Sequence, residues 1–280
     1  MSQGLSSCPS LRGVPRSGTT KQTPRSKEIA SSLTSFAPRN DALTNIYSIL
    51  YRHFGPRHWW PADTKFEVII GAILTQNTAW VNVERAIENL KKEHLLSPKK
   101  LYNLDNKKLA ELIRPSGYYN IKAKRVKAFL KFLFEYHNGS LKKLFANNLP
   151  DLRDQLLTVN GIGPETADSI ILYAAGKPTF VVDAYTKRIF SRQGLISVSA
   201  TYEETKKFFA DNLPRSAKLF NEYHVLIVEL GKNICKTKPE CDVCPINASL
   251  RGVPTKSARR SKLRFKCGDC FAPRCARGSQ

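Results

Sequence analysis

The stretch Val159-Asn160-Gly161-Ile162-Gly163-Pro164-Glu165-Thr166-Ala167 decides the fold of this 280-residue chain. An apolar helical face ends before it at Leu157, and helical spacing resumes from Thr166 to Tyr173 with side chains suited to burial. Gly161 and Gly163 permit a tight turn with positive φ between the two helices. The pattern therefore predicts a helix-hairpin-helix.

The hairpin predicts a contact with phosphate groups. The start of its second helix carries unpaired backbone N–H groups and a partial positive charge, which suit the phosphates of a DNA backbone. Gly161, Gly163 and Thr166 are the candidate contacts, and they would hold the backbone without reading its sequence. Glycines spaced in this way also occur in ordinary packing turns, so a purely structural hairpin is the alternative.

Asp183 follows the hairpin in the sequence. It stands 18 residues after Glu165, behind the apolar pair Val181-Val182 and at the start of a predicted helix over 183–193. A carboxylate in that position would lie over the ligand that the hairpin holds. An aspartate that only caps the helix is the alternative.

Together, the hairpin, its Gly/Pro-rich connection and the aspartate resemble the helix-hairpin-helix glycosylases of the endonuclease III superfamily. The resemblance implies an all-α fold with two helical lobes and a DNA-binding cleft between them. It implies Asp183 as the catalytic residue of a base-excision-repair DNA N-glycosylase. It also implies a monomer that acts on double-stranded DNA containing damaged bases.

The composition agrees with a DNA partner. The chain has 45 Lys and Arg residues against 23 Asp and Glu residues, a formal net charge of +22, and such a field attracts polyanions. A membrane surface is the rival partner, but the sequence has no run of about 18 apolar residues and no apolar secretory signal. We expect an intracellular protein without a membrane partner.

The two ends of the chain differ in composition from its middle. Residues 1–40 are rich in Ser, Thr, Pro and basic residues, which predicts a disordered basic arm or, alternatively, a transit peptide. Residues 251–280 hold nine Lys and Arg residues against Asp269 alone, which predicts a basic, cysteine-containing tail.

The middle of the chain, residues 41–250, is predicted to be an all-α glycosylase core. Apolar residues recur there at helical spacing, and Gly, Pro and Ser residues interrupt the pattern. Following the resemblance, we assign a central lobe to about 66–174 and a second lobe to about 41–65 plus 175–234. A cysteine-rich loop follows at 235–250.

Tryptophans mark a predicted base pocket. Adjacent tryptophans cannot both face one helical core, so Trp59 or Trp60 is expected at a pocket or at the surface. Enzymes that act on a base in duplex DNA extrude it and hold it between aromatic faces, and a tryptophan face attracts a cationic alkylated purine by about 0.5–2 kcal/mol. We predict a pocket of Trp59, Trp60, Pro61 and Trp80, with core packing as the alternative.

Two further segments resemble DNA contacts of the superfamily. Leu74-Thr75-Gln76-Asn77-Thr78 matches a helix end whose glutamine enters the duplex where the flipped base was, which makes Gln76 and its neighbour Asn77 DNA-binding candidates. A buried Gln76 that satisfies the helix end is the alternative. Arg114-Pro115-Ser116-Gly117-Tyr118-Tyr119-Asn120 precedes a basic helix start with three candidate phosphate contacts, or else a solvated basic face: Lys122, Lys124 and Arg125.

The hairpin also bears on the reaction type. The tryptophan and glutamine segments most resemble the 3-methyladenine DNA glycosylases of endonuclease III type, which implies an alkylated purine as the excised base. Members that also cut the strand carry a lysine two residues after the second hairpin glycine, and its amine forms a Schiff base at C1′. Glu165 holds that position here and cannot do so. Lys187, four residues beyond Asp183, has no motif match as a substitute and is kept as a DNA-binding candidate.

We therefore predict a monofunctional glycosylase in which Asp183 stabilises an oxocarbenium-like state and orients or deprotonates water. A glycosylase with AP lyase activity, in the manner of endonuclease III, is one alternative. A non-enzymatic helix-hairpin-helix module that binds DNA is the other.

Six of the seven cysteines lie within residues 235–275, at spacings typical of metal ligands. Cys235, Cys241 and Cys244 resemble three of the four ligands of the superfamily's [4Fe-4S] cluster, but the usual position of the fourth holds Leu250. The alternatives are no metal, or a zinc site built from two Cys-x2-Cys pairs: Cys241, Cys244, Cys267 and Cys270.

Overall fold

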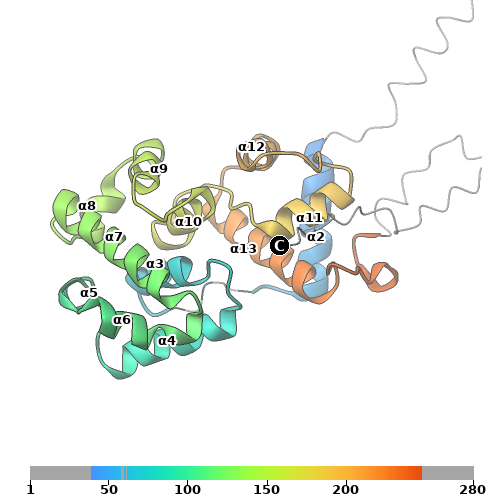
Figure 1. The fold of residues 1–280 in the computed structure, drawn as a ribbon. Coiled ribbons are helices and arrows are strands. Elements are labelled where there is room, and N and C mark those ends of the chain that lie inside the picture. The colour runs from blue at the N-terminus through green and yellow to red at the C-terminus, as the bar shows by residue number, and fades with distance from the viewer. Residues whose placement is uncertain (1–38, 58–59, 61, 248–280) are drawn as a thin grey trace, which may run out of the picture. The chain divides into compact units, whose positions relative to one another are not determined.

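A computed structural model describes residues 39–57, 60 and 62–247. Every regular element within these residues is a helix, as the sequence predicted (Figure 1). The helices surround two buried apolar clusters, which we call the first core and the second core. The predicted tail and most of the predicted arm lie outside the described residues.

The first core is built around one helix that is buried on all sides. Helix α3 spans Lys65–Leu74, and every residue from Phe66 to Leu74 is buried, which matches its nearly unbroken apolar sequence. Burying each large apolar side chain stabilises the fold by about 1.5–3 kcal/mol. The other elements of this core are α4 (Trp80–Lys92), α5 (Pro98–Asn103), α6 (Asn106–Leu112), the 3-10 turn η1 (Arg114–Ser116), α7 (Tyr119–His137), α8 (Leu141–Ala146), α9 (Leu149–Leu157) and α10 (Pro164–Ser169).

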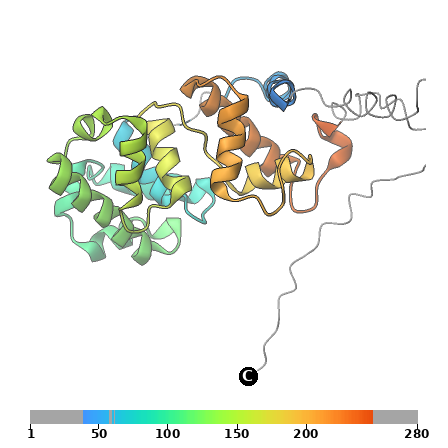
Figure 2. The same ribbon diagram turned by 90° about the horizontal axis from the view of Figure 1, so that it is seen from above.

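The second core lies around helix α13, Ala217–Asn233, which packs against α11, Ala184–Arg192, and against α2, Arg39–Phe54. Figures 1 and 2 both show α11 and α13 side by side. Aromatic rings fill the cluster, and Phe180 stacks on Phe209 from α12, Tyr202–Asn212, with centroids 3.9 Å apart. A 3-10 turn, η3 (Cys241–Val243), follows α13.

Side-chain caps define where several helices begin. Thr64 accepts a hydrogen bond from the Glu67 amide at the start of α3, and Thr201 with Glu204 forms a capping box at the start of α12. Each cap of this kind stabilises a helix by about 1 kcal/mol. Asp183 is the cap of α11.

The second helix of the hairpin differs from the prediction of one regular α-helix. After α10 the chain widens into a π-helix, η2, at Ile170–Ala174, where the Ala175 amide donates to the Ile170 carbonyl at 3.0 Å. Periodicity alone did not reveal this change. Tyr173, near the end of η2, packs against both cores.

A buried cluster of charges joins the hairpin to α12. Asp168 on α10 is fully buried, and its carboxylate accepts hydrogen bonds from Arg153 at 3.1 Å, Lys206 at 2.7 Å and Tyr202 at 2.8 Å. Thr179 donates a fourth at 2.9 Å. We call these groups the Asp168 cluster. Because every charge in it has a partner, it resembles a structural anchor.

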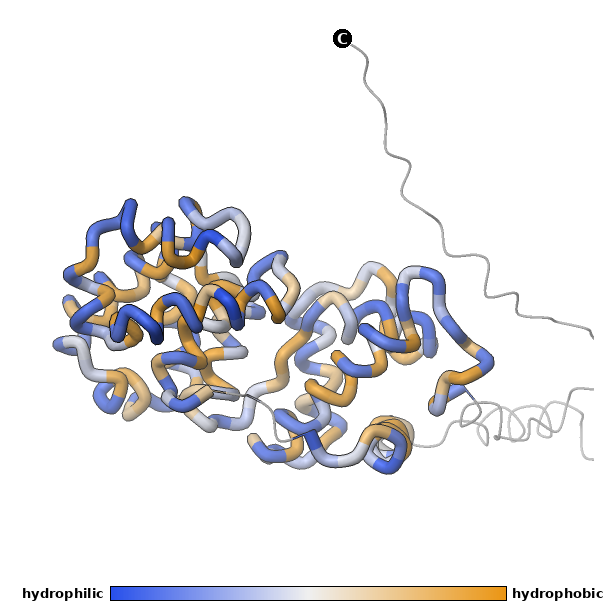
Figure 3. Tube along the Cα trace, turned by 90° about the horizontal axis from the view of Figure 1, so that it is seen from below, coloured by the Kyte–Doolittle hydropathy of each residue, from blue (hydrophilic) through white to orange (hydrophobic). Residues whose placement is uncertain are grey.

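Apolar and polar residues alternate along the described helices (Figure 3). Each helix therefore offers one face to a core and another to solvent, except α3. No helix among the described residues is long and apolar enough to cross a membrane.

Candidate active site

The hairpin forms where the sequence predicted it, between α9 and α10. Gly161 has φ +85°, and a Cβ added there would lie 2.3 Å from Cγ of Arg125. Only glycine therefore fits this turn without displacing Arg125. Gly163 begins α10, and no side chain caps that helix end.

Gln76 lies against the hairpin. Its Nε2 donates to the Gly161 carbonyl at 3.0 Å and to Thr166 Oγ1 at 2.8 Å, and its Oε1 accepts from Arg125. The side chain is half-buried and bonds to the hairpin instead of the end of α3, so its entry into a duplex stays a prediction. These bonds place four of the predicted DNA-binding residues in one contact group: Gln76, Arg125, Gly161 and Thr166.

The prediction that Lys122 contacts phosphate is wrong for this structure. Only 1% of Lys122 is exposed, and its Nζ donates to the carbonyls of Leu74 and Ser116, both at 2.7 Å, and to Thr78 Oγ1 at 2.5 Å. Burial, helped by the charge of Arg125, lowers the pKa of Lys122 to about 8. Lys122 is therefore a buried residue whose hydrogen bonds connect α7 to the loop that carries Gln76.

The remaining predicted contacts differ in accessibility. Lys124 and Asn77 are exposed, and Asn77 takes a positive φ of 52° in the loop after α3. Lys187 is half-buried, and its Nζ donates to the Ala200 carbonyl at 3.0 Å. Lys124 and Asn77 can reach a partner as they stand, and the Lys187 ammonium keeps further N–H donors beside the one given to Ala200.

Asp183 caps α11 through one carboxylate oxygen. Oδ1 accepts from the Thr186 amide at 2.7 Å and from Thr186 Oγ1 at 2.8 Å. Oδ2 lies 3.7 Å from Nε2 of His224, which is beyond hydrogen-bond distance. The side chain is 12% exposed. Asp183 is thus a helix cap, and one of its oxygens keeps unused acceptor capacity.

Two residues that the sequence analysis did not assign to the site lie beside Asp183. His224 on α13 and Tyr173 on η2 are joined by a hydrogen bond between Nδ1 and the phenol oxygen. Burial lowers the pKa of His224 against the opposing effect of Asp183, and burial together with Asp183 raises the pKa of Tyr173. Both side chains are therefore neutral near pH 7.

Glu165 on α10 is exposed and lies near enough to Asp183 for the two carboxylates to interact electrostatically. Loss of hydration, then the charge of Asp183, raises the pKa of Glu165 to about 7, although its side chain still reaches solvent. A carboxyl group with a raised pKa therefore stands near a second carboxyl group, an arrangement found at sites of acid–base chemistry.

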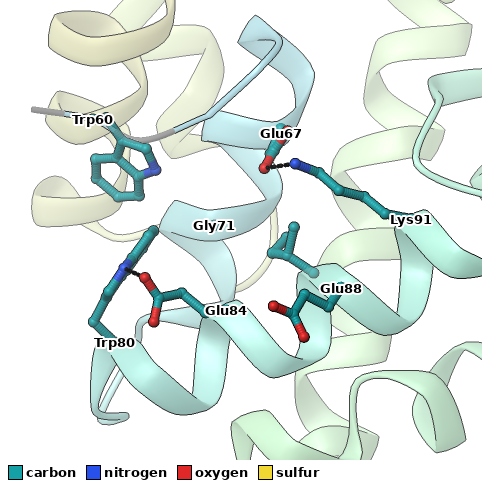
Figure 4. A pocket seen from close by; sticks show the side chains of 8 residues that line it. Trp60, Glu67, Gly71, Trp80, Glu84, Glu88 and Lys91 are labelled. Atoms are coloured by element: carbon teal, nitrogen blue, oxygen red, sulfur yellow. Dashed lines mark hydrogen bonds and ion pairs between the residues drawn. The ribbon is translucent and has the colours of Figure 1, made fainter.

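An aromatic pocket of about 370 Å³ adjoins this region. Trp60 and Trp80 meet edge to face with ring centroids 5.0 Å apart, and Figure 4 shows both rings at one end of the pocket. Gly71 lets Trp60 approach α3, since an added Cβ would lie 3.1 Å from that ring. Trp59 and Pro61 lie outside the described residues.

Acidic side chains complete the pocket. Glu84 accepts from the Trp80 indole nitrogen at 2.6 Å, and Glu67 pairs with Lys91 at 2.7 Å (Figure 4). Glu88 also lines the cavity. These glutamates were not predicted as pocket residues. Trp80, Glu84 and Glu88 nevertheless share one helical face, at i, i+4 and i+8.

A chain of contacts leads from the pocket to Asp183. The Trp60 ring lies 5.1 Å from the Tyr173 ring, Tyr173 bonds to His224, and His224 faces Asp183. Residues from four separate elements or loops therefore form one chain of contacts between the pocket and Asp183.

The cysteine loop lies at the end of α13. Cys235 is buried and its sulfur accepts from Arg192 at 3.3 Å, while burial, then the proximity of Cys235, raises the pKa of Cys244. Arg192 suits a thiolate, but the described residues bring no three Cys, His, Asp or Glu side chains together as a metal-binding group. The predicted iron–sulfur cluster at Cys235, Cys241 and Cys244 therefore stays a prediction. Cys267 and Cys270 lie outside the described residues.

Comparison with known proteins agrees with this fold and site. The HhH-GPD superfamily of base excision DNA repair proteins matches residues 70–215. A protein of Methanocaldococcus jannaschii that is provisionally named a DNA repair glycosylase is 53% identical over 207 residues, 74% of this chain and 94% of the relative. Endonuclease III of Thermotoga maritima is 31% identical over 180 residues, 64% of this chain and 79% of the relative. The chain belongs to the HhH-GPD superfamily of DNA glycosylases.

Solved structures show the same fold. The 3-methyladenine DNA glycosylase of H. pylori, bound to 1,N6-ethenoadenine, has a TM-score of 0.61 and 32% identity, and the match covers 70% of this chain and 98% of that one. Endonuclease III trapped covalently on DNA has a TM-score of 0.65 at 21% identity, covering 77% and 99%. The predicted all-α fold and superfamily are thereby confirmed.

Proposed function

We propose that this protein is a monofunctional DNA N-glycosylase that removes an alkylated purine from double-stranded DNA. The observation that carries the proposal is the carboxylic acid of Glu165 at the hairpin position where lyases of the superfamily have an amine, together with Asp183 at the start of α11. A carboxyl group cannot form a Schiff base with the sugar, so hydrolysis is the reaction left to this site.

Asp183 performs the central step in this proposal. Its ionised carboxylate stabilises the positive charge that develops on the sugar as the glycosidic bond breaks. Thr186 donates two hydrogen bonds to Oδ1, so Oδ2 is the oxygen left to interact with the sugar in this proposal. The same carboxylate orients the water that attacks C1′.

The aromatic pocket selects the base. Trp60 and Trp80 offer π-faces and edges to a flipped base. Alkylation places positive charge on a purine, and that charge is attracted by indole rings and by the Glu84 carboxylate beside Trp80. A neutral base of the same size lacks both attractions. The H. pylori glycosylase of similar fold is named for 3-methyladenine, which supports the same class of base.

The DNA backbone is held outside the pocket. The amides of the hairpin and exposed Lys124 bind phosphate in this proposal. Gln76 enters the duplex after leaving its present partners Gly161 and Thr166. Binding of DNA therefore rearranges the contact group that Gln76 forms with the hairpin.

The cysteine loop has a structural role in the proposal. Cys235, Cys241 and Cys244 are the side chains that would hold an iron–sulfur cluster or zinc, with the fourth ligand supplied from beyond residue 247. Such a group would fix the loop behind α13 and take no part in the hydrolysis.

The test is to incubate the purified protein with a duplex that carries 3-methyladenine. Free base and strand breaks are measured in parallel, the breaks before and after hot alkali. We expect free base, with breaks only after alkali. Breaks without alkali, together with a DNA adduct trapped by borohydride, would establish a lyase instead. Equal binding to damaged and intact duplexes with no base release would establish a DNA-binding module.

A further inference from the structure

His224 carries a buried group with no partner. Its Nε2 is fully shielded from solvent and has no hydrogen bond within the described part of the chain. Leaving a buried polar group unpaired costs about 1–3 kcal/mol. Such a group in a folded protein requires a reason, and Oδ2 of Asp183 lies 3.7 Å from it.

The neighbours of His224 fix which ring nitrogen carries the hydrogen. A carboxylate only accepts hydrogen bonds, so Nε2 must be the protonated nitrogen if it faces Asp183 favourably. Nδ1 is then the acceptor, and the Tyr173 hydroxyl donates to it. The reverse tautomer would direct a nitrogen lone pair at a carboxylate oxygen.

The position of Tyr173 adds a second link. Its ring packs 5.1 Å from the Trp60 ring of the aromatic pocket, and it lies on the π-helix where the two cores meet. A ring that packs on the pocket residue Trp60 is thus bonded to the histidine that faces the Asp183 carboxylate. Thr186 already holds Oδ1 of Asp183, so an N–H at Oδ2 would fix the carboxylate at both oxygens.

We propose that His224 and Tyr173 are positioning residues for Asp183, with the Tyr173 hydroxyl holding His224 in the tautomer whose Nε2–H directs Oδ2 of Asp183. This inference rests on the proposed glycosylase function for its kinetic part, whereas the tautomer is a property of the protein alone.

The first measurement is the tautomer. Two-bond ¹H–¹⁵N NMR spectra of the labelled protein distinguish the two neutral forms of an imidazole, and His224→Gln assigns the signal by its disappearance. We expect protonated Nε2 in the wild type and a mixture of tautomers in Tyr173→Phe. Protonated Nδ1 in the wild type would overturn the proposal, whether or not the protein releases any base.

The second measurement is the single-turnover rate of base release, with the dissociation constant for the same lesion duplex measured separately. Loss of a hydrogen bond to a charged group predicts a rate about 10- to 100-fold lower for His224→Leu, at a nearly unchanged dissociation constant. His224→Gln places an amide N–H near the position of Nε2 and should recover most of the rate. Tyr173→Phe keeps the ring against Trp60 and should lower the rate by an intermediate factor.

Matched controls separate positioning from packing. His137 is also a buried histidine, bonded to Gln155 Oε1 at 3.0 Å, and Tyr223 is a buried tyrosine whose hydroxyl donates to the Leu43 carbonyl at 2.9 Å. His137→Leu and Tyr223→Phe should lower the melting temperature without the rate loss.

If His224→Leu does not fold, Tyr173→Phe and His224→Gln carry the test. Equal rate losses in His224→Gln and His224→Leu, or rates equal to wild type in Tyr173→Phe, would contradict the proposal. Failure of the wild type to release any base would refute the proposed function, and the tautomer measurement would still decide this inference.

Discussion

Two aspartates in this protein have opposite surroundings. Asp168 is fully buried, and four side chains donate to its two oxygens. Asp183 is 12% exposed, and the hydrogen bonds it accepts from the described side chains and amides all come from Thr186 to Oδ1. A carboxylate whose acceptors are all used stabilises a fold, whereas one with an unused oxygen on a partly exposed side chain can bind or react.

The side chains that surround the two aspartates also differ in charge. Arg153 and Lys206 neutralise Asp168, whereas Asp183 faces a neutral histidine and Glu165, whose pKa is raised to about 7. The Asp183 carboxylate would therefore be available to stabilise positive charge that develops on a bound sugar. The Asp168 cluster offers nothing to a ligand.

Asp183→Asn should give the largest effect. The variant keeps the Oδ1 cap for Thr186 but removes the negative charge, so the single-turnover rate of base release should fall by about 100-fold or more. The melting temperature and the affinity for lesion DNA should change little. Single-turnover kinetics with the alkylated duplex measure the loss, and base release at the wild-type rate would rule out Asp183 as the catalytic residue.

Asp168→Asn should have its effect on stability. Removing one charge from a buried network leaves Lys206 without its charged partner and Arg153 with Glu203 alone, which costs about 3–5 kcal/mol. Urea unfolding measures the change. Asp154→Asn, on the exposed face of α9, is the matched control and should stay within about 0.5 kcal/mol of wild type.

Gly161→Ala should weaken both fold and DNA binding, to a smaller extent. An alanine at φ +85° costs about 1–2 kcal/mol, and its Cβ would displace Arg125 from Gln76. Unfolding and fluorescence-anisotropy titration with duplex DNA measure the two effects. Gly163→Ala is the control for stability, because φ there is −90° and nothing lies within 4 Å of the added Cβ.

Glu165→Gln should show a small effect that depends on pH. The folded-state pKa of about 7 lies above the ordinary value of 4.5, so the neutral form stabilises the protein fully below pH 4.5 and this stabilisation is lost as the pH rises through 7. Glutamine stays neutral throughout. The gain in melting temperature over wild type should therefore be larger at about pH 8.5 than at about pH 5.

Glu111→Gln, on the exposed face of α6, controls for the loss of a surface charge. A gain for Glu165→Gln that is equal at both pH values would show that Glu165 titrates as an ordinary surface carboxylate. Asp183 would then have no neighbouring carboxylic acid that stays protonated near pH 7.

Local patterns were enough to predict much of the fold. The glycines and proline of the hairpin, the aspartate at the start of α11 and the apolar spacing of the helices are all properties of short segments. These features also carried the resemblance to the superfamily. The structure confirms the helices and the hairpin, while the roles assigned to the site residues stay predictions.

Contacts between distant segments were not predicted. Tyr173 and His224 stand 51 positions apart, and no local pattern joins them. His224 lies on the buried face of α13 with Phe220 and Ile227, at helical spacing. Its burial could therefore be predicted from the sequence, although its hydrogen-bond partner could not. The same holds for the Asp168 cluster, whose members come from three helices and a loop.

Lys122 shows a signal that was overlooked. It stands four residues before Val126 and seven before Phe129, both buried, so it occupies the apolar face of α7. The run Lys122, Lys124 and Arg125 reads as basic when taken in order, but helical geometry points Lys122 inward and exposes Lys124. Helical phase, and not local charge, decides which of these side chains can meet DNA.

The most direct test of this account compares Asp183→Asn and Asp168→Asn in one experiment. Base release from the alkylated duplex is measured at a temperature where both variants are folded, as judged by circular dichroism. The account predicts that Asp183→Asn is as stable as the wild type but nearly inactive, and that Asp168→Asn is less stable but releases base at close to the wild-type rate. Equal loss of activity in the two variants, or full activity in Asp183→Asn, would contradict it.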